Sequence, residues 1–160
     1  MTESLLGVIN FDKHIARQLT PIPAANDAYY VAVDGEPFFM EFKTGRIREE
    51  DIESKMQGSM EVCVELGIMP DADAVRSGVH YILVYNSGKY GDDSREAKEA
   101  RAVDDVYGTV TRDSSRRTLD LFHVGTFEGR YCRMAECMSE TEFYRLFVCP
   151  MEESDPCRVP

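Results

Sequence analysis

Residues 26 to 45 constrain the fold of this chain more than any other stretch, because they predict two strands joined at Asp34-Gly35, a strong hairpin signal. The second strand ends in Glu41 and Lys43, which are two residues apart and therefore point to one face. Burying such a pair is costly, so either the strand emerges into solvent there or the pair has a function. Asp27 precedes the first strand, and folding of the hairpin brings it back beside Glu41 and Lys43.

The register of this hairpin decides whether the three charged side chains share a face. A two-residue loop would pair Asp27 with Phe42, and Asp27 would then face away from Glu41, because directly opposed residues point to the same side of a sheet. A three-residue loop over 34 to 36 pairs Asp27 with Lys43 and places the charges on one face. We predict this odd-numbered loop, or an equivalent bulge near Asp27, with the two carboxylates close enough to share one ion.

The same stretch resembles the motif of the PD-(D/E)XK nuclease superfamily, which is an Asp, a hairpin-length gap, an Asp or Glu, one apolar residue and a Lys. The matching positions in this chain are Asp27, Glu41, Phe42 and Lys43. Asn26 replaces the proline that usually precedes the Asp. The resemblance spans roughly residues 1 to 86 and implies a restriction-endonuclease-like core.

The order of the predicted elements agrees with that core. In its first half the pattern predicts a helix over 4–19, the hairpin, a long helix over 47–66 and a buried strand over 79–85. In the second half it predicts a surface helix over 94–106, an exposed loop over 109–118, strands over 119–124 and 130–138, and a short helix opened by a capping box at 139–142. We therefore predict an α/β fold with a mixed central sheet of about four to five strands flanked by helices.

The candidate site suits metal-assisted hydrolysis of a phosphodiester. Mg²⁺ can supply a nucleophilic water and neutralise charge on phosphate, and it usually takes one or two carboxylates, which Asp27 and Glu41 provide. The resemblance implies Mg²⁺ or Mn²⁺ as the metal, the Phe42 carbonyl as a further ligand, and Lys43 as the group that orients the nucleophile or stabilises the transition state. It also implies a Gln or Lys facing the site from the long helix, and we assign Gln57, with Lys55 as the other candidate.

Each of these residues also has a purely structural interpretation. Glu41 and Lys43 can form an exposed ion pair worth only about 0–1 kcal/mol, and Asp27 can be a turn residue. Lys55 and Gln57 can lie on the plain surface of their helix. The three histidines have no metal-ligand spacing.

Phosphate contacts require local positive charge, although the net charge of the chain is −11. The candidate side chains are Arg46, Arg48, Lys89, Arg112, Arg116 and Arg117. Arg46 and Arg48 directly follow the Glu-x-Lys strand, so we predict a basic strip beside the site. Scattered solvated charge is the alternative, and strong acidity argues against sequence-independent coating of DNA.

The remaining composition indicates an ordinary globular protein in a reducing compartment. Five cysteines form no CxxC pair, which favours free thiols over a disulfide framework or a zinc site. No signal peptide and no run of about 20 apolar residues is evident, so we expect a cytoplasmic location without a membrane partner. We expect one domain over residues 1–150 and a polar tail over 151–160, with a homodimer left open.

Taken together, the sequence predicts a metal-dependent nuclease that hydrolyses DNA. Two rivals belong to other classes. One is a non-catalytic binding or inhibitory protein on the same fold, such as a DNA mimic or an immunity-type factor, which the acidity favours. The other is a structural subunit whose hairpin edge serves assembly.

Overall fold

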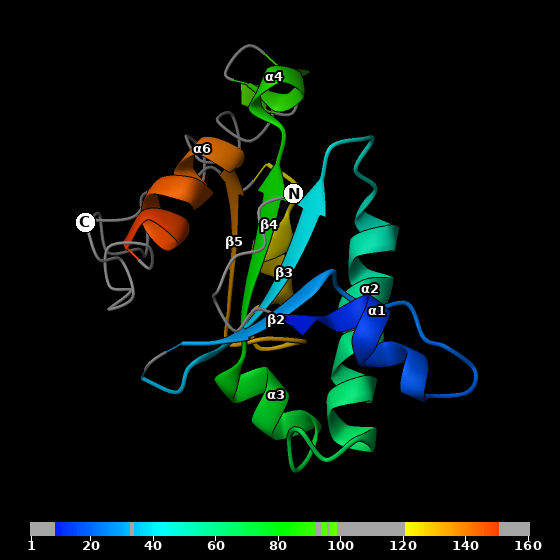
Figure 1. Cartoon of the computed structure of the whole chain (residues 1–160). Helices are drawn as coiled ribbons and strands as arrows, with labels where there is room; N and C mark the ends of the chain where they lie inside the picture. Colours follow the sequence, from blue (N-terminus) through cyan, green and yellow to red (C-terminus); the bar gives the residue numbers. More distant parts are fainter. Residues whose placement is uncertain (1–8, 33, 92–93, 96, 99–120, 151–160) are drawn as a thin grey trace.

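A five-stranded mixed sheet forms the centre of the protein, with the strands in the order β1-β2-β3-β4-β5. The computed structural model describes residues 9–32, 34–91, 94–95, 97–98 and 121–150 (Figure 1). The strands are β1 (Ile9–Asn10), β2 (Ala28–Val31), β3 (Pro37–Lys43), β4 (His80–Tyr85) and β5 (Met134–Ser139). The first three pair antiparallel, whereas β4 and β5 run parallel to β3, which confirms the predicted α/β class and mixed sheet.

Helices cover both faces of this sheet (Figure 1). On one face lie α1 (Phe11–His14) and the long α2 (Glu49–Glu65), and on the other lie α6 (Glu140–Phe143) and the π-helical turn Tyr144–Val148, while α3 (Ala72–Gly78) lies at the end of the sheet where β4 begins. The chain also forms short helices at Ala16–Gln18, α4 (Ser87–Tyr90) and Val124–Phe127. In the part of the chain that the structure describes, none of the helices combines the length and the apolar character of a membrane span.

Alternation along β3 sends its side chains into two separate apolar clusters. Phe39 belongs to the larger cluster, in which Ile52 and Met56 of α2 are fully buried. Met40 belongs to a smaller cluster on the opposite face, against which Phe143 packs. Residues 41 and 43 therefore point to the side of α2, as Phe39 does.

The hairpin has the odd-numbered loop that the sequence predicts, but its position differs. Ala28 pairs with Met40, and the Ala32 N–H donates to the Glu36 carbonyl, so three positions, 33 to 35, separate the two strands. Gly35 has φ of 89° and is the last residue of this loop, where a three-residue loop requires a left-handed conformation. The register is shifted by two residues, so Asp27 lies opposite Glu41 rather than Lys43.

The long helix, the central strand and the C-terminal capping box agree with the sequence. The helix predicted over 47–66 is α2, and the strand predicted over 79–85 is β4. The Ser139 hydroxyl accepts the Glu142 N–H while the Glu142 carboxylate accepts the Ser139 N–H, which is the capping box expected at the start of α6. These elements carry strong local signals that tertiary packing does not oppose.

The single helix predicted near the N-terminus is wrong for the described part of that segment. Residues 9 to 18 divide into β1, α1 and a short 3-10 turn. Asn10 ends the strand and caps α1 by accepting the Lys13 N–H, while the Phe11 N–H donates to the Asp27 carbonyl. Phe11 packs against Tyr29 and Phe39, so contacts with the hairpin override the helical periodicity.

The strand predicted over 119–124 is also wrong where the structure describes it. Residues 121 and 122 form a turn, and a 3-10 helix follows at Val124–Phe127. His123 has φ of 52°, a left-handed conformation that a strand cannot contain. β5 begins at Met134 rather than at 130. The predicted loop over 109–118, the tail over 151–160 and most of the helix predicted over 94–106 lie outside the described residues.

Candidate functional site

Four charged side chains meet where β2 begins and β3 ends. Asp27 and Glu41 lie opposite each other in the hairpin, and Lys43 follows on the same face of β3. Lys55 reaches them from α2, which lies against this face of the sheet (Figure 1). The hairpin loop and the alternation of side chains along β3 are the local causes of this convergence.

Lys55 contacts both carboxylates of this cluster. Its Nζ lies 3.0 Å from Oδ1 of Asp27, 2.7 Å from Oε1 of Glu41 and 2.9 Å from Oε2 of Glu41. The Nζ of Lys43 lies 2.8 Å from Oε1 of Glu41. Two ammonium groups thus neutralise two carboxylates.

Glu41 is fully buried, and such a charge is stable only when it is paired and hydrogen-bonded. Both of its oxygens have partners, because the Asp27 N–H also donates to Oε2 at 3.2 Å. Burial raises the pKa of Glu41, while the hydrogen bonds from Lys43 and Lys55 oppose that shift. For Lys55, burial lowers the pKa, but its bonds and attraction to Glu41 and Asp27 outweigh burial and raise it overall.

Asp27 is held by the backbone as well as by Lys55. Its Oδ2 accepts the Phe42 N–H at 2.9 Å, which fixes the carboxylate across the end of β3. The Asp27 side chain is 36% exposed, so the cluster opens to solvent on this side. The Phe42 ring points to the opposite face and packs against Phe143.

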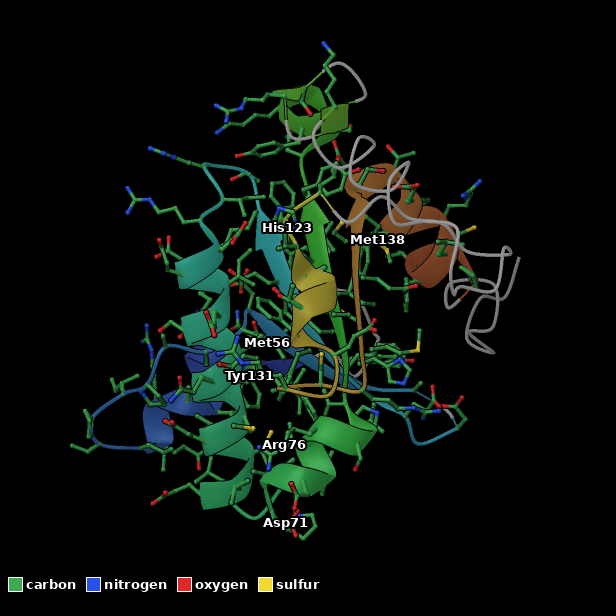
Figure 2. The ribbon with its side chains drawn as sticks, turned by 180° about the vertical axis from the view of Figure 1, so that it is seen from behind. Met56, Asp71, Arg76, His123, Tyr131 and Met138 are labelled. Atoms are coloured by element: carbon green, nitrogen blue, oxygen red, sulfur yellow. The ribbon has the colours of Figure 1, made fainter. Side chains whose placement is uncertain are left out.

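The segment before Asp27 is fastened directly to α2. The buried Asn26 donates its backbone N–H to the Ser59 hydroxyl at 2.8 Å and its side-chain amide to the sulfur of Met56. Met56 is on the side of α2 that faces the sheet (Figure 2). A Cβ at Gly58 would lie only 1.8 Å from the Ala24 carbonyl oxygen, so the helix and this segment touch backbone to backbone.

Tyr90 holds the link between β3 and α2 in place through two hydrogen bonds. The Tyr90 hydroxyl donates to the Gly45 carbonyl and accepts the Ile47 N–H, both at 3.1 Å. These bonds bring α4 against the link between β3 and α2. Exposed Arg46 and Arg48 belong to that link, and Lys89 lies on α4 beside Tyr90.

Arg46, Arg48 and Lys89 therefore lie on segments that adjoin the end of β3, and the basic strip stays a prediction. In the described part of the chain none of them makes an ion pair. The remaining predicted phosphate contacts, Arg112, Arg116 and Arg117, lie outside the described residues.

The structure does not bring Gln57 into the cluster. Gln57 is exposed and donates to the Glu61 carboxylate on the outer side of α2, whereas Lys55 takes the inward place. At about 100° per residue, Lys55 lies about 60° from Ile52 on the helical wheel and Gln57 about 140°. The buried stripe of α2 contains Ile52 and Met56, so this difference in angle would have selected Lys55 from the sequence alone.

The oxygen atoms of the cluster fit a hard divalent cation. Lys55 places a positive charge between the carboxylates of Asp27 and Glu41, so the structure itself shows a cation held at this point. Within the described ranges no group of three or more His, Cys, Asp or Glu side chains is arranged to hold a metal. Mg²⁺ usually takes one or two carboxylates and keeps several waters, so the pair is a sufficient donor set.

Chemically, the cluster combines a partly open carboxylate, a buried carboxylate and two ammonium groups within hydrogen-bonding distance. Such a set can bind a cation, position a phosphate oxygen or serve as a closed ion network. Comparisons of the chain with protein-family models, with curated proteins and with solved structures found no match.

Proposed function

We propose that this protein is a metal-dependent nuclease that hydrolyses DNA phosphodiester bonds. The observation that carries the proposal is the convergence of Asp27, Glu41 and Lys43 on one face at the end of the hairpin. A register shifted by one residue would have placed Asp27 on the opposite face and separated the carboxylates.

The arrangement of elements supports a restriction-endonuclease-like core. An antiparallel β1-β2-β3 sheet is followed by α2 and by β4, which runs parallel to β3. From β2 onward this is the order that the sequence resemblance implies, with Asp27 before β2 and the Glu-x-Lys sequence at the end of β3, whereas β1 was not expected.

In this proposal Asp27 and Glu41 would hold Mg²⁺ or Mn²⁺, and the Phe42 carbonyl would add a ligand. Bound there, the metal would supply a water of lowered pKa and neutralise charge on the phosphate. Lys43 is 20% exposed and keeps its ammonium at the rim of the cluster, where it orients the attacking water or stabilises the transition state. Arg46, Arg48 and Lys89 contact the DNA backbone.

The test compares cleavage of plasmid, linear duplex and single-stranded DNA by the wild type and Lys43→Ala, with Mg²⁺, Mn²⁺ or EDTA. We expect metal-dependent cleavage by the wild type and a loss of about 10²-fold or more in Lys43→Ala, the usual cost of removing one transition-state contact. Lys13→Ala removes an exposed lysine of α1 and is the matched control for contaminating nucleases.

An unchanged circular dichroism spectrum and a cooperative melting transition would show that Lys43→Ala still folds, because Lys55 continues to pair with Glu41. Cleavage by Lys43→Ala at the wild-type rate would remove Lys43 from the mechanism. Absence of cleavage by the wild type under every metal condition would reject the nuclease proposal.

The second candidate is a non-catalytic binding or inhibitory protein on the same fold. It is favoured by the complete pairing of Asp27 and Glu41 with lysines, which makes the cluster a closed ion network, and by the net charge of −11. A closed network of this kind can serve structure alone. The same assay separates the candidates, because this protein would bind a partner and cleave no DNA.

A further inference from the structure

We propose that Lys55 is a built-in counter-ion that occupies the cation position between Asp27 and Glu41, and that it must withdraw before a divalent cation binds. Lys55 would therefore determine the affinity of the site for its metal ion. This inference rests on the metal site of the proposed function.

The distances carry the argument. The Lys55 Nζ contacts three oxygens of the two carboxylates at 2.7 to 3.0 Å. Mg²⁺ would lie about 2.0–2.1 Å from the same oxygens, so it would overlap the position of the ammonium group. Two cations that close would also repel each other strongly, since the surroundings are partly buried. Occupation by Lys55 and by a divalent cation therefore exclude each other.

Lys55 can leave, whereas Glu41 cannot. The Lys55 side chain is 24% exposed and ends a flexible four-carbon stem, so its ammonium can turn toward water. Glu41 is fully buried at the end of β3 and keeps Lys43 as a partner when Lys55 withdraws. Solvent reaches the cluster beside Asp27, which is 36% exposed and provides the route for the incoming ion.

The exchange has a cost that lowers metal affinity. Withdrawal of Lys55 breaks charge-assisted hydrogen bonds to both carboxylates, and the incoming cation must replace them. A neutral side chain at this position would leave two facing carboxylates with only Lys43 to offset them. Such a site should bind divalent cations more tightly and should destabilise the protein when no cation is added.

The experiment measures Mn²⁺ binding by isothermal titration calorimetry to the wild type, Lys55→Met and the exposed-lysine control Lys13→Met. We expect Lys55→Met to bind Mn²⁺ about 10-fold or more tightly than the wild type, within the usual range of coupling between two sites. We also expect its melting temperature to fall in EDTA and to rise with Mn²⁺ by more than that of the wild type. Lys13→Met should match the wild type in both measurements.

Equal or weaker Mn²⁺ binding by Lys55→Met would overturn the inference. Lys55→Gln is the second variant should Lys55→Met not fold, and it carries the same expectation. The double variant Glu41→Gln/Lys55→Met should lose the gain, and persistence of the gain would place the added binding elsewhere and overturn the inference. Failure of the nuclease proposal is separate: tighter Mn²⁺ binding by Lys55→Met alongside an inactive wild type would reject cleavage and retain the counter-ion.

Discussion

At the scale of single residues, Glu41 shows how the fold tolerates a buried charge. Its carboxylate accepts from Lys43, Lys55 and the Asp27 backbone, so no oxygen is left without a donor. Breaking such a pair by removing one partner typically costs about 3–5 kcal/mol, because it leaves an uncompensated charge in a poorly solvated site. The cluster therefore has a structural cost that an apolar core would avoid, which is the physical reason to look for a function there.

Two buried thiols give a prediction for alkaline pH. Cys63 and Cys132 are fully buried, and burial raises the pKa of each from 9.0 to about 12. Below pH 9 the folded and unfolded states both keep these protons. Between pH 9 and 12 the unfolded state loses them while the folded state keeps them, so stability must fall as pH rises.

We expect Cys63→Ala to show a shallower loss of unfolding free energy than the wild type between pH 8.5 and 10.5. One thiol contributes up to about 1.4 kcal/mol per pH unit within its window. Urea unfolding under reducing conditions measures this slope. Val62→Ala, a truncation of the adjacent buried residue without an ionisable group, should keep the wild-type slope. Identical slopes for Cys63→Ala and the wild type would contradict the prediction.

At this scale the sequence predicts which residues form most of the candidate site, but it does not predict the distances between them. A period of two and an odd-numbered loop suffice to place Asp27, Glu41 and Lys43 together. The inward position of Lys55 follows from helical geometry, whereas the family resemblance implies either a Gln or a Lys and leaves Lys55 and Gln57 both open. The ion-pair distances depend on how closely α2 approaches the sheet, which no local pattern encodes.

At the scale of secondary-structure elements, α2 positions the site. Its buried face contacts the hairpin, and Gly58 lets the helix approach the Ala24–Asp27 segment closely. Ser59 and Met56 accept hydrogen bonds from Asn26, so the residue before Asp27 is held against the helix. The helix thus determines where one carboxylate stands relative to the other.

We expect Gly58→Ala to destabilise the protein, although alanine ordinarily favours a helix over glycine by up to about 1 kcal/mol. The added Cβ would meet the Ala24 carbonyl oxygen at 1.8 Å, and such overpacking typically costs about 1–3 kcal/mol. Urea unfolding of Gly58→Ala and the wild type measures the difference. Gly78→Ala in α3 is the matched control, because nothing lies within 4 Å of its Cβ. If Gly58→Ala were as stable as Gly78→Ala, the close approach of α2 to Ala24 would not limit the size of the residue at position 58, and the prediction would be wrong.

The elements also show which sequence signals are reliable. α2 and β4 were predicted because their apolar patterns are long and regular. The predictions of the N-terminal helix and of the strand over 119–124 were wrong because individual residues of these segments pack against elements that are far away in the sequence. Phe11 fits between Tyr29 and Phe39, and Leu121 donates its N–H to the sulfur of Cys137. Such contacts between residues far apart in sequence override local propensity.

At the scale of the whole molecule, a strongly acidic chain carries three basic side chains on segments that adjoin the end of β3. The net charge is −11, yet the Tyr90 bonds bring Arg46, Arg48 and Lys89 toward the end of β3. α3 and its Arg76 precede β4 and therefore lie at the opposite end of the sheet (Figure 1). Phosphate contacts are local, so under the proposed function the acidic remainder would weaken DNA binding without abolishing it.

If the protein binds DNA as proposed, the dependence of that binding on salt measures how many phosphates these three side chains contact. The logarithm of affinity falls with the logarithm of salt concentration by about 0.9 per contacted phosphate, so Arg46, Arg48 and Lys89 predict a slope of roughly −3. We expect Arg46→Ser/Arg48→Ser to reduce the magnitude of that slope by about 2 in fluorescence anisotropy with duplex DNA, and to weaken binding for all sequences alike. Arg76→Ser removes one positive charge at the far end of the sheet, where Arg76 pairs with Asp73, and should leave the slope unchanged. A slope that the double variant does not alter would mean that DNA contacts another surface, and the basic side chains beside the candidate site would then be ordinary solvated charge.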